Sequence, residues 1–317
     1  MKVSGRLING DRLAEIADIV FGSRYQKPLT VKQLQSALKP FNHDVAIVYM
    51  DTDLTNLFFD VLTQVPAGQL IIVTHNGDAG VQQAPRRECD ADFGKINASV
   101  FRWFAQNVQV ADPRVVPIPI GLERTVVAPA ARKEYHIRVR MGRASPRRHL
   151  LYMNHSISTN ARERAHLYKF FSGRPWVFSR SYPPGIPYTA YLDELCASYF
   201  CLSPPGNGLD CHRTWEALYV GCYPVLQRST MTQKLYSDLP VVLVDDYEEV
   251  TESRLNAELE RIRSLSVAKR RFFVEYYHHQ ILDAAAQAGS QIVRAIPRPS
   301  WRERLENTLA GWRLERG

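Results

Sequence analysis

The segment that most restricts the fold of this chain is residues 203–226, SPPGNGLDCHRTWEALYVGCYPVL. Its prolines and glycines exclude a helix at 204–208, so a loop is predicted there. Asp210 is the predicted N-cap of a helix that Gly221 ends, and a strand with Pro224 near its start follows. The side chains predicted to share the buried face of this helix are Thr214, Trp215 and Leu218. The segment is therefore one loop, helix and strand unit of an α/β fold.

A glycine-containing loop that opens onto a helix leaves backbone N–H groups free beside the positive end of the helix dipole. Arg213, in the first turn, adds a guanidinium whose planar fork matches phosphate oxygens. Glu216, one turn further on, can accept hydrogen bonds from a ribose diol. A capped core helix after an ordinary loop is the alternative, and it explains the glycines without the Arg and the Glu. The combination favours a phosphate-binding site.

The string PPGNGLDCHRTWEALYVGCYPVL resembles the donor-site segment of exostosin-type glycosyltransferases, closely over 198–228 and loosely over 149–250. In that family a Gly-rich loop, an Arg, a Trp/Phe-Glu-Ala-Leu helix and a Gly-Cys-x-Pro-Val strand follow in this order. The resemblance implies a GT-B architecture, in which two Rossmann-like domains with parallel sheets face a central cleft. It assigns Arg213 to the donor diphosphate and Glu216 to the nucleoside ribose, and it implies an inverting, metal-independent transfer.

One position departs from the family pattern. Many GT-B enzymes carry two glutamates eight positions apart, whereas Gly208 stands eight positions before Glu216. Recognition of the base and the sugar therefore does not follow from such a pair. The expected donor is a nucleotide sugar, with UDP favoured over GDP, and no further cofactor is expected. The residues predicted to bind this donor are Asn154, His155, Gly206, Asn207, Gly208, His212, Arg213 and Glu216.

Strand and helix patterns alternate in both halves of the chain, whose 317 residues exceed the usual size of one domain. Continuous apolar runs at 45–50 and 69–74 indicate parallel strands buried on both faces. Residues 96–107 have helical spacing, and the alternation restarts at residue 150. These patterns predict doubly wound sheets. The expected parts are an acceptor-side domain at 1–125, a basic linker at 126–148, a nucleotide-sugar-binding domain at 149–298 and a C-terminal helix at 299–317.

Ligands of parallel α/β sheets bind beyond the carboxyl ends of the strands. His75 and Asp78 follow the 69–74 strand, and either suits the general base that deprotonates an acceptor hydroxyl. Asn154 and His155 follow the first strand of the second half, where an amide or an imidazolium would stabilise the leaving diphosphate. Each of these polar residues could instead only cap a turn.

The formal net charge of +8 indicates an anionic partner, and much of the excess lies between residues 132 and 148. The sequence lacks the interleaved aromatics and zinc spacings of nucleic-acid modules, so a glycan or lipid-linked acceptor is expected, with peripheral membrane contact left open. Arg162 and Arg164, at the start of a helix predicted at 160–171, could reach the same diphosphate, but they are interpreted as solvated charges. Five cysteines without a CxxC pair, and no recognisable signal sequence, indicate a cytoplasmic protein with reduced thiols. No feature indicates an oligomeric state.

Three alternatives remain beside this interpretation. Asp51 and Asp53 follow a buried strand, as the Asp-x-Asp metal motif of GT-A glycosyltransferases does, although Asp51 also suits the N-cap of a helix at 51–62. A non-catalytic protein that binds a nucleotide or a glycan needs the same donor site without the base. An NAD-type Rossmann enzyme is disfavoured, because no G-x-G-x-x-G follows the first strand of either half.

The final segment has an amphipathic pattern. Four apolar side chains fall on one helical stripe of residues 299–317, namely Trp301, Leu305, Leu309 and Trp312. The stripe suits a helix that crosses back onto the N-terminal domain, as GT-B enzymes often have. An interfacial membrane helix is the alternative, but the mixed Arg and Glu charges favour docking.

Overall fold

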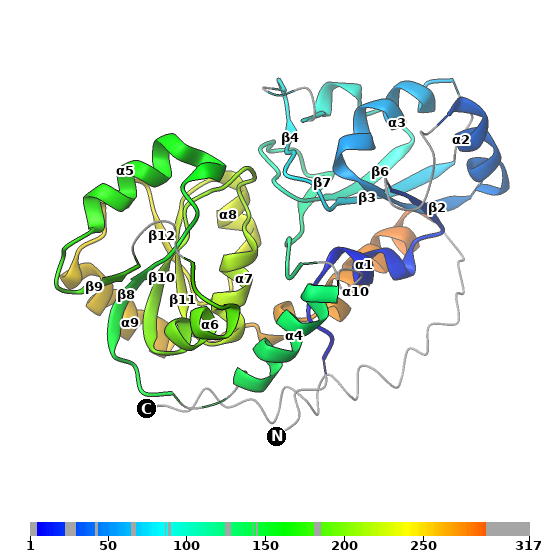
Figure 1. Ribbon diagram of the computed structural model, residues 1–317. Helices are drawn as coiled ribbons and strands as arrows, with labels where there is room; N and C mark the ends of the chain where they lie inside the picture. The colour runs from blue at the N-terminus through cyan, green and yellow to red at the C-terminus, as the bar shows by residue number, and fades with distance from the viewer. Residues whose placement is uncertain are drawn as a thin grey trace.

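The structure is a computed structural model, shown in Figure 1. It describes residues 5–22, 30–41, 44–64, 68–85, 87, 90–123, 128–141, 143, 145–180 and 185–289, with the backbone alone for 128–132. The described strands include two five-stranded sheets in which every pairing is parallel. The predicted α/β class with Rossmann-like alternation is therefore confirmed. The predicted helix at 299–317 lies outside the described residues.

The N-terminal sheet has the strand order β1-β2-β3-β6-β7. Its strands are β1 Ile19–Phe21, β2 Val45–Asp51, β3 Gln69–His75, β6 Val100–Ala105 and β7 Val115–Pro117. β2 is buried throughout and β3 is buried after its first residue, as their apolar runs predicted. The helices α2 (Val31–Leu38) and α3 (Thr55–Leu62) belong to this half, and β4 (Val81–Gln82) pairs with β5 (Ala91–Asp92) in a separate ribbon.

The helix predicted at 96–107 is wrong, because this segment contains β6. Its run VFRWFA is rich in β-branched and aromatic residues, which favour strands. Trp103 is fully buried, its indole N–H donates to Thr74 Oγ1 over 3.0 Å, and its ring meets Phe59 edge-on with centroids 5.2 Å apart. In so short a segment, apolar spacing does not separate a helix from a strand that is buried on both faces.

The C-terminal sheet has the order β12-β11-β10-β8-β9. Its strands are β8 His149–Met153, β9 Val177–Ser179, β10 Ser198–Leu202, β11 Tyr223–Gln227 and β12 Val242–Val244. The helices of this half are α5 Ala161–Phe171, α6 Tyr188–Cys196, α7 His212–Tyr219, α8 Thr230–Leu235 and α9 Glu252–Ser264. The predicted loop, helix and strand unit is confirmed: α7 buries Thr214, Trp215 and Leu218, and Gly221 follows it with φ +75°.

The segment predicted as a basic linker, 126–148, contains the helix α4 (Ala128–Arg140). Ile137 of α4 is fully buried, and the carboxylate of Glu134 pairs with the guanidinium groups of Arg12 and Arg138. The polar composition of this segment therefore reflects a helix with one packed face rather than a solvated connection.

The two halves share one hydrophobic core. α10 (Val274–Gln287) lies against α1 (Gly10–Leu13) and contacts the N-terminal strands β2, β3 and β6 (Figure 1). Tyr219 of α7 links the segment before α1 to the segment before α10, since its hydroxyl accepts from Ile8 N over 3.2 Å and donates to Phe272 O over 3.0 Å. The chain thus returns to the N-terminal sheet through α10. Among the described helices, none has both the length and the apolar character needed to cross a membrane.

Candidate functional site

The strand order of the C-terminal sheet reverses between β8 and β10, because the chain passes from β8 to β9 on one side and later to β10 on the other. The strand order of the N-terminal sheet, in contrast, follows the chain. Ligands of α/β sheets bind outside the carboxyl ends of strands at such a reversal. Two segments emerge there: residues 154–159, here called the β8 loop, and residues 203–208, here called the β10 loop. The structure therefore brings the predicted donor-binding residues of both segments to one switch point.

Arg213 belongs to the first turn of α7, and its side chain reaches the β8 loop. Its Nε donates to the backbone oxygen of Asn154 over 3.2 Å. The Asn154 side chain donates to the Tyr152 hydroxyl, which donates to Glu194, and both distances are 2.6 Å. Nη1 of Arg213 is buried and has no hydrogen-bond partner among the described residues. A buried donor without a partner costs free energy, so this guanidinium is suited to a ligand that accepts hydrogen bonds.

His155 is 1% exposed, and its Nε2 lies 3.4 Å from the backbone oxygen of Arg164. Burial, followed by the positive charge of Arg213, lowers the pKa of His155 to about 3. This pKa favours a neutral ring at physiological pH, so a neutral hydrogen-bond donor fits this position better than the imidazolium. Its Nδ1 is buried and has no partner among the described residues.

Arg164 is not the solvated charge that the sequence suggested, because it is only 3% exposed. Its guanidinium donates to Pro204 O over 2.9 Å, to Pro205 O over 2.8 Å and to Ser156 O over 2.9 Å. Arg164 shares the buried face of α5 with Leu167 and Phe171, at the i, i+3, i+7 spacing that marks a core face. That spacing was the available signal for its burial.

The two glycines of the β10 loop lie close to side chains of other segments. A Cβ on Gly208 would lie 2.6 Å from Asn107 Nδ2, and one on Gly206 would lie 3.0 Å from Arg164 Nη2. Asn107 itself has a left-handed backbone, with φ +51°, and its side-chain oxygen accepts from Asp210 N over 2.9 Å. The loop is thus fitted to neighbours from both halves, which the sequence pattern did not indicate.

Asp210 was predicted to cap α7, and this is wrong: Cys211 occupies the N-cap position and makes no side-chain cap. The buried Asp210 carboxylate joins the two halves of the chain instead. It accepts hydrogen bonds from Ile120 N over 2.8 Å, from the indole of Trp215 over 2.9 Å and from the hydroxyl of Tyr236 over 2.6 Å.

His212 also faces the N-terminal half, since its Nδ1 lies 2.8 Å from the backbone oxygen of Gly121. Gly121 has φ +64°, and a Cβ there would lie 2.3 Å from Ile8 O, so only glycine fits this crossing. His212 therefore sits at the junction of the halves, next to the predicted donor-binding residues of α7.

Glu216 accepts hydrogen bonds from two tyrosines of α6. The hydroxyl of Tyr188 donates to Oε1 over 2.8 Å, and that of Tyr191 donates to Oε2 over 3.0 Å. Each carboxylate oxygen keeps further acceptor capacity. The arrangement orients Glu216 and does not prevent it from accepting a ribose hydroxyl.

The first predicted base, His75, is 1% exposed and has both ring nitrogens close to oxygen atoms. Nδ1 lies 3.0 Å from Asn76 Oδ1 and Nε2 lies 2.9 Å from Pro119 O. These contacts favour the protonated ring, but burial has the larger effect and lowers the pKa of His75 to about 4. An acceptor hydroxyl has no direct access to either nitrogen in this arrangement.

The second predicted base, Asp78, is exposed and meets the β10 loop. Its Oδ2 accepts from the side chain of Asn207 over 3.1 Å. Arg87 lies across the same junction, because it donates to Asp78 O over 2.8 Å and to Asn207 O over 2.9 Å. A carboxylate of the N-terminal half and a predicted donor-binding residue are therefore adjacent.

Asp51 and Asp53 do not share one environment. Asp51 is 3% exposed and accepts from the side chain of Asn76 over 3.1 Å, whereas Asp53 is exposed. Across the part of the chain that the structure describes, no three His, Cys, Asp or Glu side chains are grouped to hold a metal ion. Asp51 also makes no side-chain cap, and β2 extends through it to a short 3₁₀ turn before α3.

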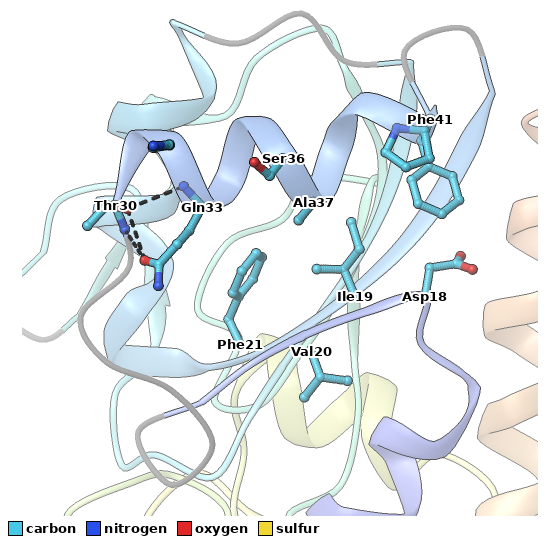
Figure 2. Close-up of a pocket in the computed structure, with 11 residues that line it drawn as sticks. Asp18, Ile19, Val20, Phe21, Thr30, Gln33, Ser36, Ala37 and Phe41 are labelled. Carbon is cyan, nitrogen blue, oxygen red and sulfur yellow. Dashed lines mark hydrogen bonds between the residues drawn. The ribbon is translucent and has the colours of Figure 1, made fainter.

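A pocket lies elsewhere, between β1 and α2 at the edge of the N-terminal sheet (Figure 2). Ile19, Phe21 and Ala37 give it an apolar floor, and the Thr30–Gln33 capping box lies at one end. It contains none of the predicted site residues. The predicted donor-binding residues lie at the switch point of the C-terminal sheet instead.

No protein-family model matches the chain, and no curated protein matches it. A chain of the solved structure described as "Crystal structure of GtfA/B complex" is 11% identical, over 88% of this chain and 60% of that chain, with a TM-score of 0.32. The present chain thus spans less than two thirds of its length. A likeness this weak supports no argument about activity, and the exostosin resemblance stays a prediction.

Proposed function

We propose that this protein is a glycosyltransferase of GT-B architecture that moves a sugar from a nucleotide-sugar donor to a hydroxyl of a glycan or other acceptor. The observation that carries the proposal is the buried, unpartnered Nη1 of Arg213 at the β8–β10 switch point. A phosphate oxygen is the acceptor that an arginine fork fits best. The return of α10 to the N-terminal sheet supports the two-domain arrangement.

In this proposal Arg213 binds the diphosphate beside the first turn of α7, where the helix dipole adds to the attraction. Glu216 binds the ribose diol, and the β10 loop supplies backbone N–H groups. The preference for UDP, the inversion and the independence of metal rest on the exostosin resemblance. Asp78 is the better placed base, since it is exposed at the junction with Asn207 and His75 is not.

Alanine at Arg213 is expected to weaken UDP binding by about 1.5–3 kcal/mol, because a charged hydrogen-bond donor to the diphosphate is lost. Isothermal titration calorimetry with UDP, GDP and CMP in EDTA measures this effect. Arg162→Ala is the matched control, since it removes an exposed arginine from the same half. Submillimolar UDP binding by the wild-type chain and the control is expected. Equal affinity in Arg213→Ala would contradict the assignment.

A second candidate, a nucleotide- or glycan-binding protein without catalysis, is favoured by one observation: both ring nitrogens of His75 are occupied and the ring is buried. The two candidates differ in turnover. The transferase is expected to release UDP from a UDP-sugar in the presence of a glycan acceptor or, slowly, water. Asp78→Asn should lower this rate by about 10²–10⁴-fold without changing UDP affinity. Asp53→Asn, another exposed carboxylate of the same half, should leave the rate unchanged.

A further inference from the structure

We propose that Arg164 is the positioning residue of the candidate site, because its guanidinium ties the β8 loop to the β10 loop. Residues of the β8 loop contribute two acceptors, Ser156 O and Thr159 Oγ1, and both accept from Nη1. Residues of the β10 loop contribute Pro205 O, which accepts from Nε, and Pro204 O, which accepts from Nη2. One buried side chain thus connects the two segments that define the switch point.

All the hydrogen-bonding capacity of Arg164 is used within the protein. A guanidinium has five N–H donors, and the fifth points at Cys211 Sγ over 3.6 Å. Arg164 therefore has no donor left for a phosphate, in contrast to Arg213, whose Nη1 has no partner among the described residues. The two arginines have separate tasks: Arg213 faces a ligand, and Arg164 holds the loops that frame it.

The β10 loop depends on this arginine because of its own sequence. Pro204 and Pro205 have no N–H, so the loop cannot be fastened there by donors of its own. Their carbonyl groups need donors from elsewhere, and Arg164 donates to both. Asn160 Nδ2 also donates to Pro205 O over 3.2 Å, and the Cys211 thiol lies 3.8 Å from Pro204 O. Gly206 lies directly against Nη2, where a Cβ would be 3.0 Å away. A lysine could not replace the arginine, since one ammonium is a point charge and cannot span a fork of acceptors.

The position of the Arg213 side chain depends on the same link between the β8 loop and the β10 loop. Its Nε donates to Asn154 O in the β8 loop. Arg213 itself belongs to α7, which begins at His212, shortly after the β10 loop ends at Gly208. If the two loops separate, the guanidinium of Arg213 and the backbone N–H groups of the β10 loop no longer converge on one ligand. Arg164 is thus expected to act on binding through geometry, without touching the ligand.

Hydrogen–deuterium exchange tests the positioning role directly. In Arg164→Met we expect faster exchange at the amides of residues 156–160 and 206–208, while the amides of β10 keep wild-type exchange. Arg174→Met is the matched control, because the Arg174 guanidinium packs on Phe170 and Trp176 and donates to Phe170 O, away from both loops. If Arg164→Met does not fold, Arg164→Lys is measured instead, with the same expectation. Unchanged exchange in both loops would overturn the proposal.

Calorimetry with UDP is the second measurement, and this part rests on the proposed function. We expect the Kd of Arg164→Met to rise about tenfold or more, that of Arg174→Met to stay at the wild-type value, and methylguanidinium to restore part of the affinity of Arg164→Ala. A purely structural role would lower thermal stability without this chemical rescue. If the wild-type chain binds UDP and Arg164→Met binds it equally well, the positioning role is refuted. If the wild-type chain does not bind UDP, the proposed function fails, and the exchange data still decide the role of Arg164.

Discussion

Replacement of Asp210 by alanine is expected to lower the free energy of unfolding by about 3 kcal/mol or more. The substitution leaves three buried donors without an acceptor: Ile120 N, the indole N–H of Trp215 and the hydroxyl of Tyr236. Each orphaned group costs about 1–3 kcal/mol. Because Ile120 belongs to the N-terminal half and Trp215 and Tyr236 to the C-terminal half, the loss also weakens the junction between them.

Urea unfolding followed by tryptophan fluorescence measures the effect of Asp210→Ala. Asp245→Ala is the control, since Asp245 is an exposed carboxylate, 71% accessible, that pairs with Arg228 over 2.8 Å. Surface ion pairs contribute about 0–1 kcal/mol, so this control is expected to unfold close to the wild-type midpoint. A cost for Asp210→Ala no greater than that of the control would show that the buried carboxylate does not hold the junction.

The sequence predicted correctly those elements whose residue pattern strongly favours one type of secondary structure. The apolar run at 45–50 could be satisfied only by a strand buried on both faces, and the prolines and glycines at 204–208 only by a loop. The segment at 96–107 was ambiguous, because its apolar residues suit either a short buried helix or a buried strand. Its true state depends on pairing with β3 and on the contact between Trp103 and Thr74, and both of these are long-range.

The contacts that form the candidate site are harder to predict from the sequence. Asp210 is of the residue type and in the position of an N-cap, but two of the three donors to its carboxylate, Ile120 and Tyr236, lie 90 and 26 residues away. Asn107 and Arg87 contact the β10 loop from more than 100 residues away, and no local pattern marks them. Arg164 was wrongly interpreted as a solvated charge, although its spacing from Leu167 and Phe171 is a local signal for the buried face of α5. Local signals thus identified the loops, and tertiary contacts determined how they are held.

Acid stability is expected to be limited by buried histidines, of which His75 and His155 have the most strongly lowered pKa values. Burial lowers the pKa of His278 as well. Burial lowers the pKa of His75 to about 4 and that of His155 to about 3, whereas an unfolded histidine titrates near about 6.5. Between these values the unfolded chain binds protons that the folded chain does not bind. The contribution of these two histidines to the free energy of unfolding is therefore fully present above about pH 6.5, and it is lost as the pH decreases. From pH 6.5 to 5 the two residues together should lower the free energy of unfolding by roughly 3 kcal/mol.

Urea unfolding at pH 7, 6.5, 6, 5.5 and 5 measures this slope above the range in which most carboxylates titrate. His155→Gln removes one ionisable ring, so about 1.5 kcal/mol of the loss between pH 6.5 and 5 should disappear, whatever the variant costs at pH 7. His166→Gln is the control, because His166 is an exposed histidine of α5 whose side chain is 58% accessible. A wild-type slope in His155→Gln would mean that this ring already takes up protons in the folded chain, and the neutral imidazole beside Arg213 would then have to be abandoned.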